Sequence, residues 1–390
     1  MQLTKLQVQQ TLQSFLSKEN GLNQVLEILL NSMMLVERQE FLSESLDNKG
    51  NGYRFGSVFG HGCQIELKIP RDRLSAFTPT ILALFRSQES YIKEVSFQLY
   101  SKGLTTRDIS DVMQIIYGKH YSKSSISTMS RSFYEQMEAW RCRDLEKHYL
   151  ALYIDALSVK LKRGGKYQNE SFYIILALRE DFTREVIAIT NLPSESSTGW
   201  KQVLEGLKER GLESVGLFIS DNLPGMDTVI AKEFGASAHQ KCIVHLTRNL
   251  LAQVRHQDKK ELASDLKEVF RPDKMEHTKE MAYQQLMKLS QKWKTKYKAL
   301  SKYIEKLEWQ PYFVYLDYSI HIRRMIYTTN WIERFNKSCR RTLKIRGAFP
   351  DEDSVLALIT STAIEKTAKH YAYPIYNFKF EPKLNKKTAH

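Results

Sequence analysis

The stretch HYLALYIDALSVKLKRGGKYQNESFYIILALREDFTREVIAIT, residues 148–190, decides the fold of this chain. It holds three runs of β-branched and aromatic residues, HYLALYIDALSVKLK, SFYIILALRED and REVIAIT, and the turn-forming pair Gly164 and Gly165 separates the first two. Runs of this composition that are bounded by turn residues predict strands. The stretch therefore predicts three consecutive antiparallel strands.

The segments that follow alternate between helix and strand. TGWKQVLEGLKERG (198–211) predicts a helix, VGLFISD (215–221) a strand and MDTVIAKEFG (226–235) a helix, and a short strand is expected before Cys242. Three antiparallel strands followed by alternating helices and strands is the order of elements in an RNase H-like fold. We therefore expect a core of this class.

Two acidic residues occupy notable positions in the predicted strands. Asp155 lies near the middle of the first strand, and Asp221 ends the strand VGLFISD directly before the turn-forming residues Asn222, Pro224 and Gly225. Open α/β sheets bind their ligands at the carboxyl ends of strands, which favours a site at Asp221. A turn or capping residue is the alternative for either acid taken alone.

A third acid, Glu333, lies in TTNWIERFNKSCRR (328–341), which has the period of a helix. The apolar stripe of this helix is expected to contain Ile332, Phe335, Cys339 and Leu343. Glu333, Asn336 and Arg340 flank that stripe on an adjacent face. Because Asn330 precedes Glu333 by three residues, a helix capping box is the alternative role for Glu333.

Three carboxylates without an activated Ser or Cys are typical of metal-dependent phosphoryl transfer. Two Mg²⁺ ions roughly 4 Å apart activate an oxygen nucleophile and stabilise the leaving oxygen, and Mg²⁺ prefers oxygen ligands. Clustered carboxylates raise each other's pKa unless a cation lies between them. The hypothesis is a site for two Mg²⁺ ions, with Mn²⁺ as a substitute.

Five blocks of sequence, in the same order, resemble the Mutator-type transposases of bacterial insertion sequences. They are NGYRFGSVFGHGCQIELKIPRDR (51–73), YIDALSVKLKRGG (153–165), GWKQVLEGLKERGLESVGLFISDNLPGM (199–226), QKCIVHLTRN (240–249) and RRMIYTTNWIERFNKSCRRTLKIRGAFP (323–350). The chain departs from the family pattern at Asn222, where Gly is more frequent, and at Leu74 and Ser75, where Asn-Gly is more frequent. Neither departure removes an acid of the triad.

The resemblance implies a DDE triad in an RNase H-like core, with Asp155, Asp221 and Glu333 as catalytic residues and metal ligands. It also implies a homodimer that binds the terminal inverted repeats of its own element, nicks a strand and uses the freed 3′ hydroxyl to attack a second phosphodiester. The pathway that the resemblance implies is replicative movement through a circular DNA intermediate, which the sequence itself does not distinguish from cut-and-paste. An RNase H-like nuclease and a domesticated sequence-specific DNA-binding protein are the alternatives.

Cys242 and His245 form a lone Cys-x-x-His motif. Structural zinc takes four ligands, and the sequence offers no second pair at a suitable spacing. The family shares the motif beside its catalytic core. This implies a structural or supporting role near the site for both residues rather than metal ligation.

The charge of the chain suits a nucleic-acid partner. Lys and Arg exceed Asp and Glu, which gives a formal net charge of +14. Between Thr328 and Pro350 the only acid is Glu333, and the basic residues there are Arg334, Lys337, Arg340, Arg341, Lys344 and Arg346. We expect this helix to contact the DNA backbone, with Asn336 and Arg340 orienting the scissile phosphate.

Ahead of the core, residues 90–145 are expected to form a helix-turn-helix that binds DNA through Lys123, Ser124, Ser125 and Arg131; a plain helical bundle is equally compatible with the pattern. Arg71 and Arg73 of the PRDR string follow a predicted hairpin and either contact DNA or form an exposed basic turn.

The full expectation is a multidomain α+β chain whose RNase H-like core is interrupted by an all-α insertion. Its parts are 1–50, helical, for dimerisation or end binding; 51–89, a β-hairpin and basic linker; 90–145, the helix-turn-helix; 146–245, the first part of the core; 246–327, the insertion; 328–370, the second part of the core; and 371–390, a flexible basic tail.

Three finer expectations concern helices in these parts. Leu22, Leu26, Leu29 and Met33 should share the apolar face of a helix near the N-terminus. Helical spacing continues from Ala282 to Leu307 over about seven turns. Within that segment Trp293 is expected in the core rather than stacked on a base.

Neither a signal peptide nor a membrane span is predicted, because the N-terminus has no apolar h-region and no long apolar run occurs. The four cysteines, Cys63, Cys142, Cys242 and Cys339, show no paired framework. We expect a cytoplasmic protein that acts on nucleoid DNA.

Overall fold

The computed structural model describes residues 21–43, 48–60, 63–117, 123–192, 196–381 and 384; within these ranges no side chain is described at 22–23, 58–60, 63–64, 83–90, 116–117 and 123–132. The chain divides into two compact units, Met1–Phe133 and Tyr134–His390. The division falls inside helix α5 (Lys123–Cys142), and so within the region 90–145 that was expected to be one domain.

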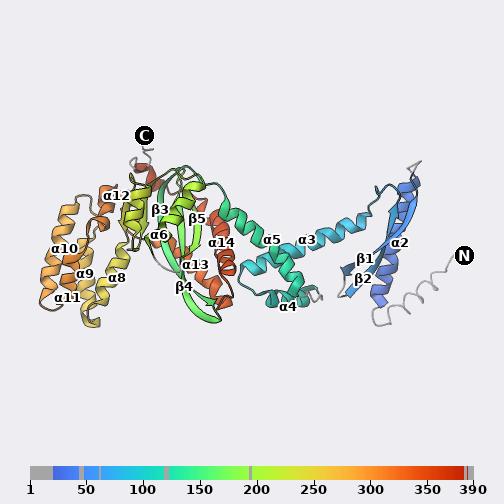
Figure 1. The fold of residues 1–390 in the computed structure, drawn as a ribbon, viewed down its shortest axis with the longest axis horizontal. Helices are drawn as coiled ribbons and strands as arrows, with labels where there is room; N and C mark the ends of the chain where they lie inside the picture. Colours follow the sequence, from blue (N-terminus) through green and yellow to red (C-terminus); the bar gives the residue numbers. More distant parts are fainter. Residues whose placement is uncertain are drawn as a thin grey trace. The chain divides into compact units, whose positions relative to one another are not determined.

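The first unit begins with a helix packed on a hairpin (Figure 1). Helix α2 (Gly21–Ser43) covers strands β1 (Gly50–Gly60) and β2 (Cys63–Asp72), which pair antiparallel and confirm the predicted hairpin. The small core between them is formed by Leu30, Met34, Ile65, Leu67, Ile69 and Leu82. Residues 61–62 of the expected turn lie outside the described part.

The apolar face expected on α2 was wrong in part. Leu30 and Met34 point into the core with the partly buried Leu26, whereas Leu29 is 51% exposed and Met33 52%. The helix meets the hairpin along a single row of residues spaced by four, so the neighbouring row stays in solvent. Leu22 lies outside the described side chains.

The first unit continues with α3 (Thr80–Ser101), α4 (Thr106–Tyr117) and the first part of α5. Helix α3 begins at Thr80, earlier than the expected start of the helical region at residue 90. A reciprocal capping box opens α4, because the Thr105 and Asp108 side chains bond each other's backbone amides. The turn at 118–122 and the side chains of Lys123, Ser124, Ser125 and Arg131 lie outside the described part, so the helix-turn-helix stays a prediction.

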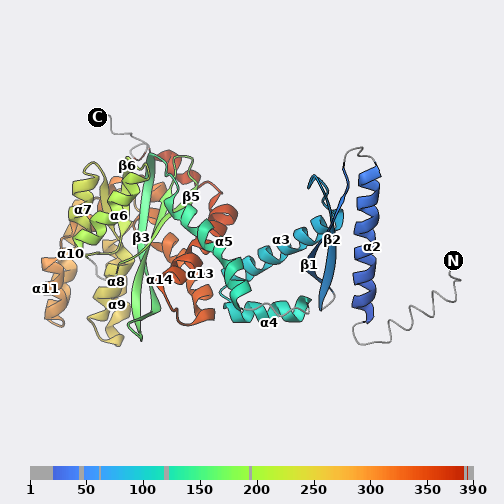
Figure 2. The same cartoon turned by 45° about the vertical axis from the view of Figure 1, so that its right-hand side comes forward.

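A five-stranded mixed sheet dominates the second unit, and Figure 2 shows it between layers of helices. Its strands lie in the order β5-β4-β3-β6-β7. Strands β3, β4 and β5 pair antiparallel, as predicted, while β6 and β7 continue the sheet parallel to β3. The strand bounds are β3 His148–Arg163, β4 Lys166–Leu178, β5 Arg184–Asn191, β6 Ser214–Ser220 and β7 Ala238–Lys241.

Helices cover both faces of this sheet, because alternate residues of the central strand face opposite sides. Leu152 and Ile154 share a core with α6 (Ser197–Glu209) and α7 (Met226–Glu233). Tyr153 and Leu157 share the other core with α8 (Ile243–Ala252), α13 (Asn330–Arg346) and α14 (Glu352–Lys366). Asp155 lies between Tyr153 and Leu157 in this alternation, and so on the side of α13.

The segment after α8 is helical, and its core is continuous with that of the sheet. Its elements are η1 (His256–Asp258), α9 (Lys259–Val269), α10 (Lys279–Lys294), α11 (Lys298–Lys306), η2 (Gln310–Tyr312), η3 (Val314–Asp317) and α12 (Ile320–Ile326). The seven-turn spacing belongs to two helices, α10 and α11, that break at Thr295–Tyr297. Trp293 is buried, as expected, and donates to Asp265 over 2.8 Å.

The expectation of a flexible tail was wrong for its described residues. Helices η4 (Thr367–Tyr371) and η5 (Tyr376–Phe380) follow α14, and Phe378 and Leu384 are buried in the core beside the sheet. A Cβ at Gly216 of β6 would lie 3.1 Å from Leu384 Cδ2, so the absent side chain lets the tail pack on the strand. Two apolar residues among polar ones are enough to anchor it.

Within the described residues, no helix combines the length and the apolar character that crossing a lipid bilayer requires.

The buried carboxylate of Glu185 in β5 joins the end of the α5 segment to the sheet. Glu185 accepts hydrogen bonds from Tyr149 Oη (2.7 Å), Arg143 Nη2 (2.8 Å) and Arg179 Nε (2.9 Å). Burial opposes ionisation, but the hydrogen bonds from Tyr149 and Arg143 and the two arginine charges hold the pKa of Glu185 below its usual value. The carboxylate is therefore charged and fully compensated.

We expect Glu185→Ala to lower the free energy of unfolding by about 2–3 kcal/mol, because it leaves the buried Tyr149 hydroxyl and the half-buried Arg143 guanidinium without the carboxylate that they bond. Urea unfolding measures the change. Glu213→Ala is the matched control, since the Lys147–Glu213 ion pair is exposed and its loss should cost less than about 1 kcal/mol. Equal effects of the two substitutions would contradict the assignment.

Candidate active site

Two of the predicted acids lie side by side at the centre of the sheet. Strands β3 and β6 are parallel neighbours in which Ile154 is paired with Ser220, so Asp155 and Asp221 each lie one residue beyond that pair. Asp155 is only 6% exposed. Burial and then the nearby Asp221 charge raise the pKa of Asp155 to about 6. The two carboxylates therefore share one site.

Asp155 is held in place from both sides. Its Oδ1 accepts the backbone N–H of Ala156 at 2.9 Å, and its Oδ2 accepts Asn336 Nδ2 from helix α13 at 2.8 Å. Asn336 is fully buried, so the structure places it behind Asp155 rather than on the surface. The opposite amide atom, Asn336 Oδ1, is also buried and has no hydrogen bond within the described residues.

Glu333 reaches the same region from α13. The N-cap residue of α13 is Thr329 and no side chain caps the helix, so Glu333 is not part of a capping box with Asn330. Its Oε1 instead accepts Arg248 Nη1 at 3.2 Å and lies 3.8 Å from His245 Nε2. The Glu333 carboxylate therefore faces helix α8.

His245 lies between Asp221 and Glu333. Its Nδ1 is 2.5 Å from Asp221 Oδ1, and these two buried atoms form a close ion pair without the angles of a hydrogen bond. The neighbouring Asp221 carboxylate, followed by the Cys242 sulfur, raises the pKa of His245 to about 10. The ring is therefore an imidazolium at neutral pH and links the two acids.

Cys242 connects the elements that meet at this site. Its backbone N–H bonds Ser220 at the end of β6, and its buried Sγ accepts Thr329 Oγ1 at 3.3 Å, just before α13. One potential ligand atom each of Asp221, Cys242 and His245 lies within 4.8 Å of the others, and no further group of this kind occurs among the described residues. Structural zinc would need a fourth ligand.

The position of Arg248 was not anticipated from the sequence. It follows His245 by three residues on α8, and its guanidinium contacts both His245 Nε2 and Glu333 Oε1 at 3.2 Å. Residues spaced by three share a helix face, so the motif Cys-x-x-His could have directed attention to this position. Helix α8 thus presents two cationic side chains to the acids.

Helix α13 carries exposed basic side chains along its length. In the described part of the chain, no carboxylate forms an ion pair with any of them. They are Arg334, Lys337, Arg340, Arg341 and Lys344. Charged side chains without acidic partners are available to an anionic ligand.

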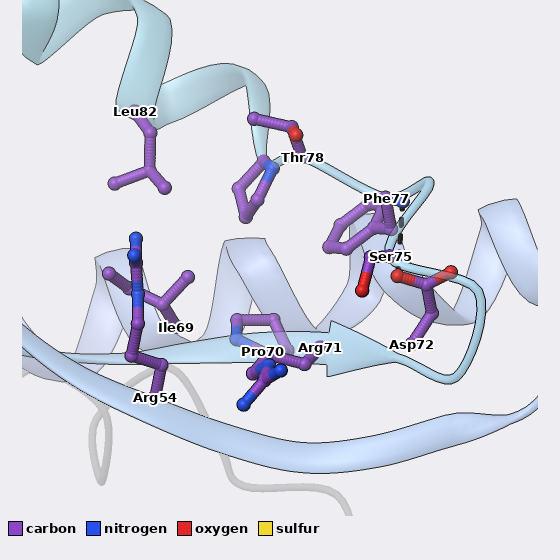
Figure 3. A pocket seen from close by; sticks show the side chains of 10 residues that line it. Arg54, Ile69, Pro70, Arg71, Asp72, Ser75, Phe77, Thr78 and Leu82 are labelled. Atoms are coloured by element: carbon purple, nitrogen blue, oxygen red, sulfur yellow. Dashed lines mark hydrogen bonds between the residues drawn. The ribbon is translucent and has the colours of Figure 1, made fainter.

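The PRDR string lies in the first unit beside the pocket shown in Figure 3. Asp72 is buried there and accepts Asn48 Nδ2 at 2.7 Å and the amides of Ala76 and Phe77, so it organises the loop after β2. Arg71 and Arg73 are exposed. Arg71 belongs to strand β2 and, with Arg54, lines the pocket of about 370 Å³. Their contact with DNA is an untested expectation.

Known proteins resemble this chain in sequence. The family model described as "Transposase, Mutator family" matches residues 1–373. The transposase for insertion sequence element IS1201 of Lactobacillus helveticus is 33% identical over 79% of this chain and 82% of its own length. The transposase for insertion sequence element IS905 of Lactococcus lactis is 28% identical over 95% of this chain and 90% of its own length.

Among solved structures, the Drosophila P element transposase strand transfer complex aligns with 75% of this chain and 83% of that chain at 9% identity. Its TM-score of 0.29 is too low to indicate a common fold.

Proposed function

Because the chain belongs to the Mutator family of transposases, we propose that it binds the terminal inverted repeats of its own insertion sequence as a homodimer, nicks a DNA strand and joins the freed 3′ hydroxyl to target DNA. The observation that carries the proposal is the convergence of Asp155, Asp221 and Glu333 from β3, β6 and α13. In this proposal water and then the 3′ hydroxyl attack the phosphodiester directly.

The sheet supports an RNase H-like assignment for this core. Its order β5-β4-β3-β6-β7, with antiparallel β3, β4 and β5 and parallel β6 and β7, is the arrangement expected for that class. In this proposal residues 146–245 and 328–370 form the core, and the helices of 246–327 are an insertion between Asp221 and Glu333. Residues 1–145 bind DNA ends and dimerise.

The donor set fits a pair of hard divalent cations, Mg²⁺ or its substitute Mn²⁺. The site offers carboxylate oxygens from three elements, and Mg²⁺ prefers such hard oxygen ligands. Asp155, Asp221 and Glu333 would hold the ions. When bound, two such ions stabilise both the attacking and the leaving oxygen of an in-line displacement.

The protein's own residues prepare the site for this chemistry. Asn336 orients Asp155 through the 2.8 Å hydrogen bond. His245 and Arg248 neutralise Asp221 and Glu333 before metal binds, which limits the repulsion among the carboxylates. The exposed basic side chains of α13, including Arg340, bind the DNA backbone and position the scissile phosphate.

The test is a strand-cleavage and joining assay with the purified full-length chain. The substrate is duplex DNA carrying the flanks of the reading frame, with Mg²⁺ or with EDTA, and both breaks and new joints are mapped. We expect end-specific nicking and joining that require Mg²⁺ and disappear in Asp155→Asn, Asp221→Asn and Glu333→Gln.

Two outcomes would replace the proposal with its alternatives. Hydrolysis without joining and without end preference would indicate an RNase H-like nuclease. Specific binding to the flanks without cleavage in either Mg²⁺ or Mn²⁺ would indicate a domesticated DNA-binding protein.

His245→Gln is expected to reduce cleavage by about 10- to 100-fold, because a residue that orients a metal ligand usually contributes this much. The Mg²⁺ concentration that gives half-maximal cleavage should rise, since Asp221 loses the partner that fixes its carboxylate. Titration of cleavage against Mg²⁺ measures both effects. Lys201→Gln, at an exposed pair with Glu205, is the control and should behave like wild type. An unchanged Mg²⁺ requirement in His245→Gln would contradict this role.

A further inference from the structure

Arg184, at the start of the edge strand β5, lies against two aromatic rings. Its guanidinium carbon is 5.2 Å from the centre of the Trp331 ring and 4.7 Å from the centre of the Tyr371 ring. Trp331 belongs to α13, two residues before Glu333, and its ring also packs on Tyr153 of β3. These cation–π contacts hold the guanidinium against the two rings.

No carboxylate compensates the charge of Arg184 within the described residues. Its Nε is buried and has no hydrogen bond there, and burial lowers the pKa of the group. Other arginines of this sheet differ, because Arg179 pairs with Glu185 and Arg163 with Glu170 at 2.9 Å each. A half-buried cation without an anionic partner is unfavourable unless a ligand supplies the anion.

A second arginine, Arg334, lies on the same helix as Trp331. Arg334 follows Trp331 by three residues, so the two share a face of α13. The positive charge of Arg334 contributes to lowering the pKa of Arg184. Arg334 itself forms no ion pair with a described residue. Two neighbouring guanidinium groups with no acid between them repel each other, and an anion that bridges them removes that repulsion.

We propose that Arg184 and Arg334 bind one phosphate of the DNA backbone, with Trp331 and Tyr371 holding the Arg184 guanidinium in place. The planar fork of arginine suits a phosphate, to which it donates two parallel hydrogen bonds. The ligand is DNA only if the proposed function holds. Packing of Arg184 on the rings as a purely structural contact is the competing explanation.

The test measures binding of the full-length protein to a labelled duplex of its own element end, by fluorescence anisotropy across a series of salt concentrations. Removing one phosphate contact should weaken binding by about tenfold and reduce the slope of log affinity against log salt by about 0.9. We expect this for Arg184→Gln and for Arg334→Gln. The double variant should match the single ones, because both arginines bind the same phosphate.

Three variants separate this proposal from a structural role. Lys147→Gln removes an exposed charge that pairs with Glu213 and should leave the slope unchanged. Arg184→Lys keeps the charge but loses the fork, and should retain the slope while binding more weakly. If Arg184→Gln does not fold, as urea unfolding will show, the more conservative Arg184→Lys still decides, since it must weaken binding at an unchanged slope.

If Arg184→Gln and Arg334→Gln keep the wild-type slope of log affinity against log salt while the wild-type protein binds its element end, the phosphate site is overturned. The proposed function is then unaffected. Additive slope changes in the double variant would overturn the shared phosphate. Failure of the wild-type protein to prefer its own ends would instead count against the proposed function.

Discussion

Asp155→Asn is expected to lower strand cleavage by about 10³-fold or more and to make the metal-free protein more stable at neutral pH. The activity falls because a metal ligand contributes several kcal/mol of transition-state stabilisation, and about 4 kcal/mol corresponds to about 10³-fold. The stability rises because Asp155 is buried beside Asp221 and its pKa is raised from 3.8 to about 6. At about 1.4 kcal/mol for each pKa unit, the ionised carboxylate costs the folded state about 3 kcal/mol.

The pH dependence of this gain follows from proton binding. Between pH 3.8 and about 6 the folded state holds the Asp155 proton more tightly than the unfolded state. The stability of the wild type therefore falls as pH rises through this window, and the full cost is present above it. An asparagine at position 155 can still accept the hydrogen bond from Asn336, and it does not ionise. The gain in the free energy of unfolding of Asp155→Asn over wild type should therefore vanish near pH 4.

Urea unfolding at pH 4, 5, 6 and 7.5 in the presence of EDTA measures the effect. Asp144→Asn, at an exposed acid, is the control and should change stability by less than about 0.5 kcal/mol at each pH. Added Mg²⁺ should stabilise the wild type but not Asp155→Asn, because only the wild type binds the ions tightly. A variant less stable than wild type at pH 7.5 would contradict the account of Asp155.

The positions of the three acids in strands and a helix were predictable, because a local sequence pattern determines each of them. An alternating run places Asp155 within a strand, and an apolar run that stops at a turn places Asp221 at a strand end. Parallel pairing of two strands then brings these positions together whatever the rest of the fold. The helix of Glu333 follows in the same way from the spacing of Ile332, Phe335 and Cys339, all of which are buried.

Other features depend on which neighbour a surface meets, and a single sequence does not encode that locally. Asn336 was expected to face DNA, but α13 packs so closely on β3 that its amide bonds Asp155. Arg248 enters the site because α8 follows directly after β7 and faces α13. The break between α10 and α11 was missed because two adjacent helices that share one core repeat the same apolar spacing as one long helix.

Glu333→Gln is expected to abolish cleavage, by about 10³-fold or more, with little change in stability. Glutamine keeps the length of the side chain and can still accept the Arg248 hydrogen bond, but it is a far weaker ligand for a hard cation. Cleavage in Mg²⁺ and urea unfolding in EDTA, measured on the same preparation, separate the catalytic role from a structural one.

A true helix cap provides the contrast that this prediction needs. Asp351 caps α14, where its Oδ1 accepts the Ser354 amide at 2.8 Å, so Asp351→Ala should cost about 1 kcal/mol of stability and leave cleavage intact. Glu333→Gln should show the reverse pattern, because Glu333 bonds Arg248 instead of a helix amide. If Glu333→Gln behaves like Asp351→Ala, the third acid is not Glu333, and the metal would then depend on Asp155, Asp221 and a ligand from another element.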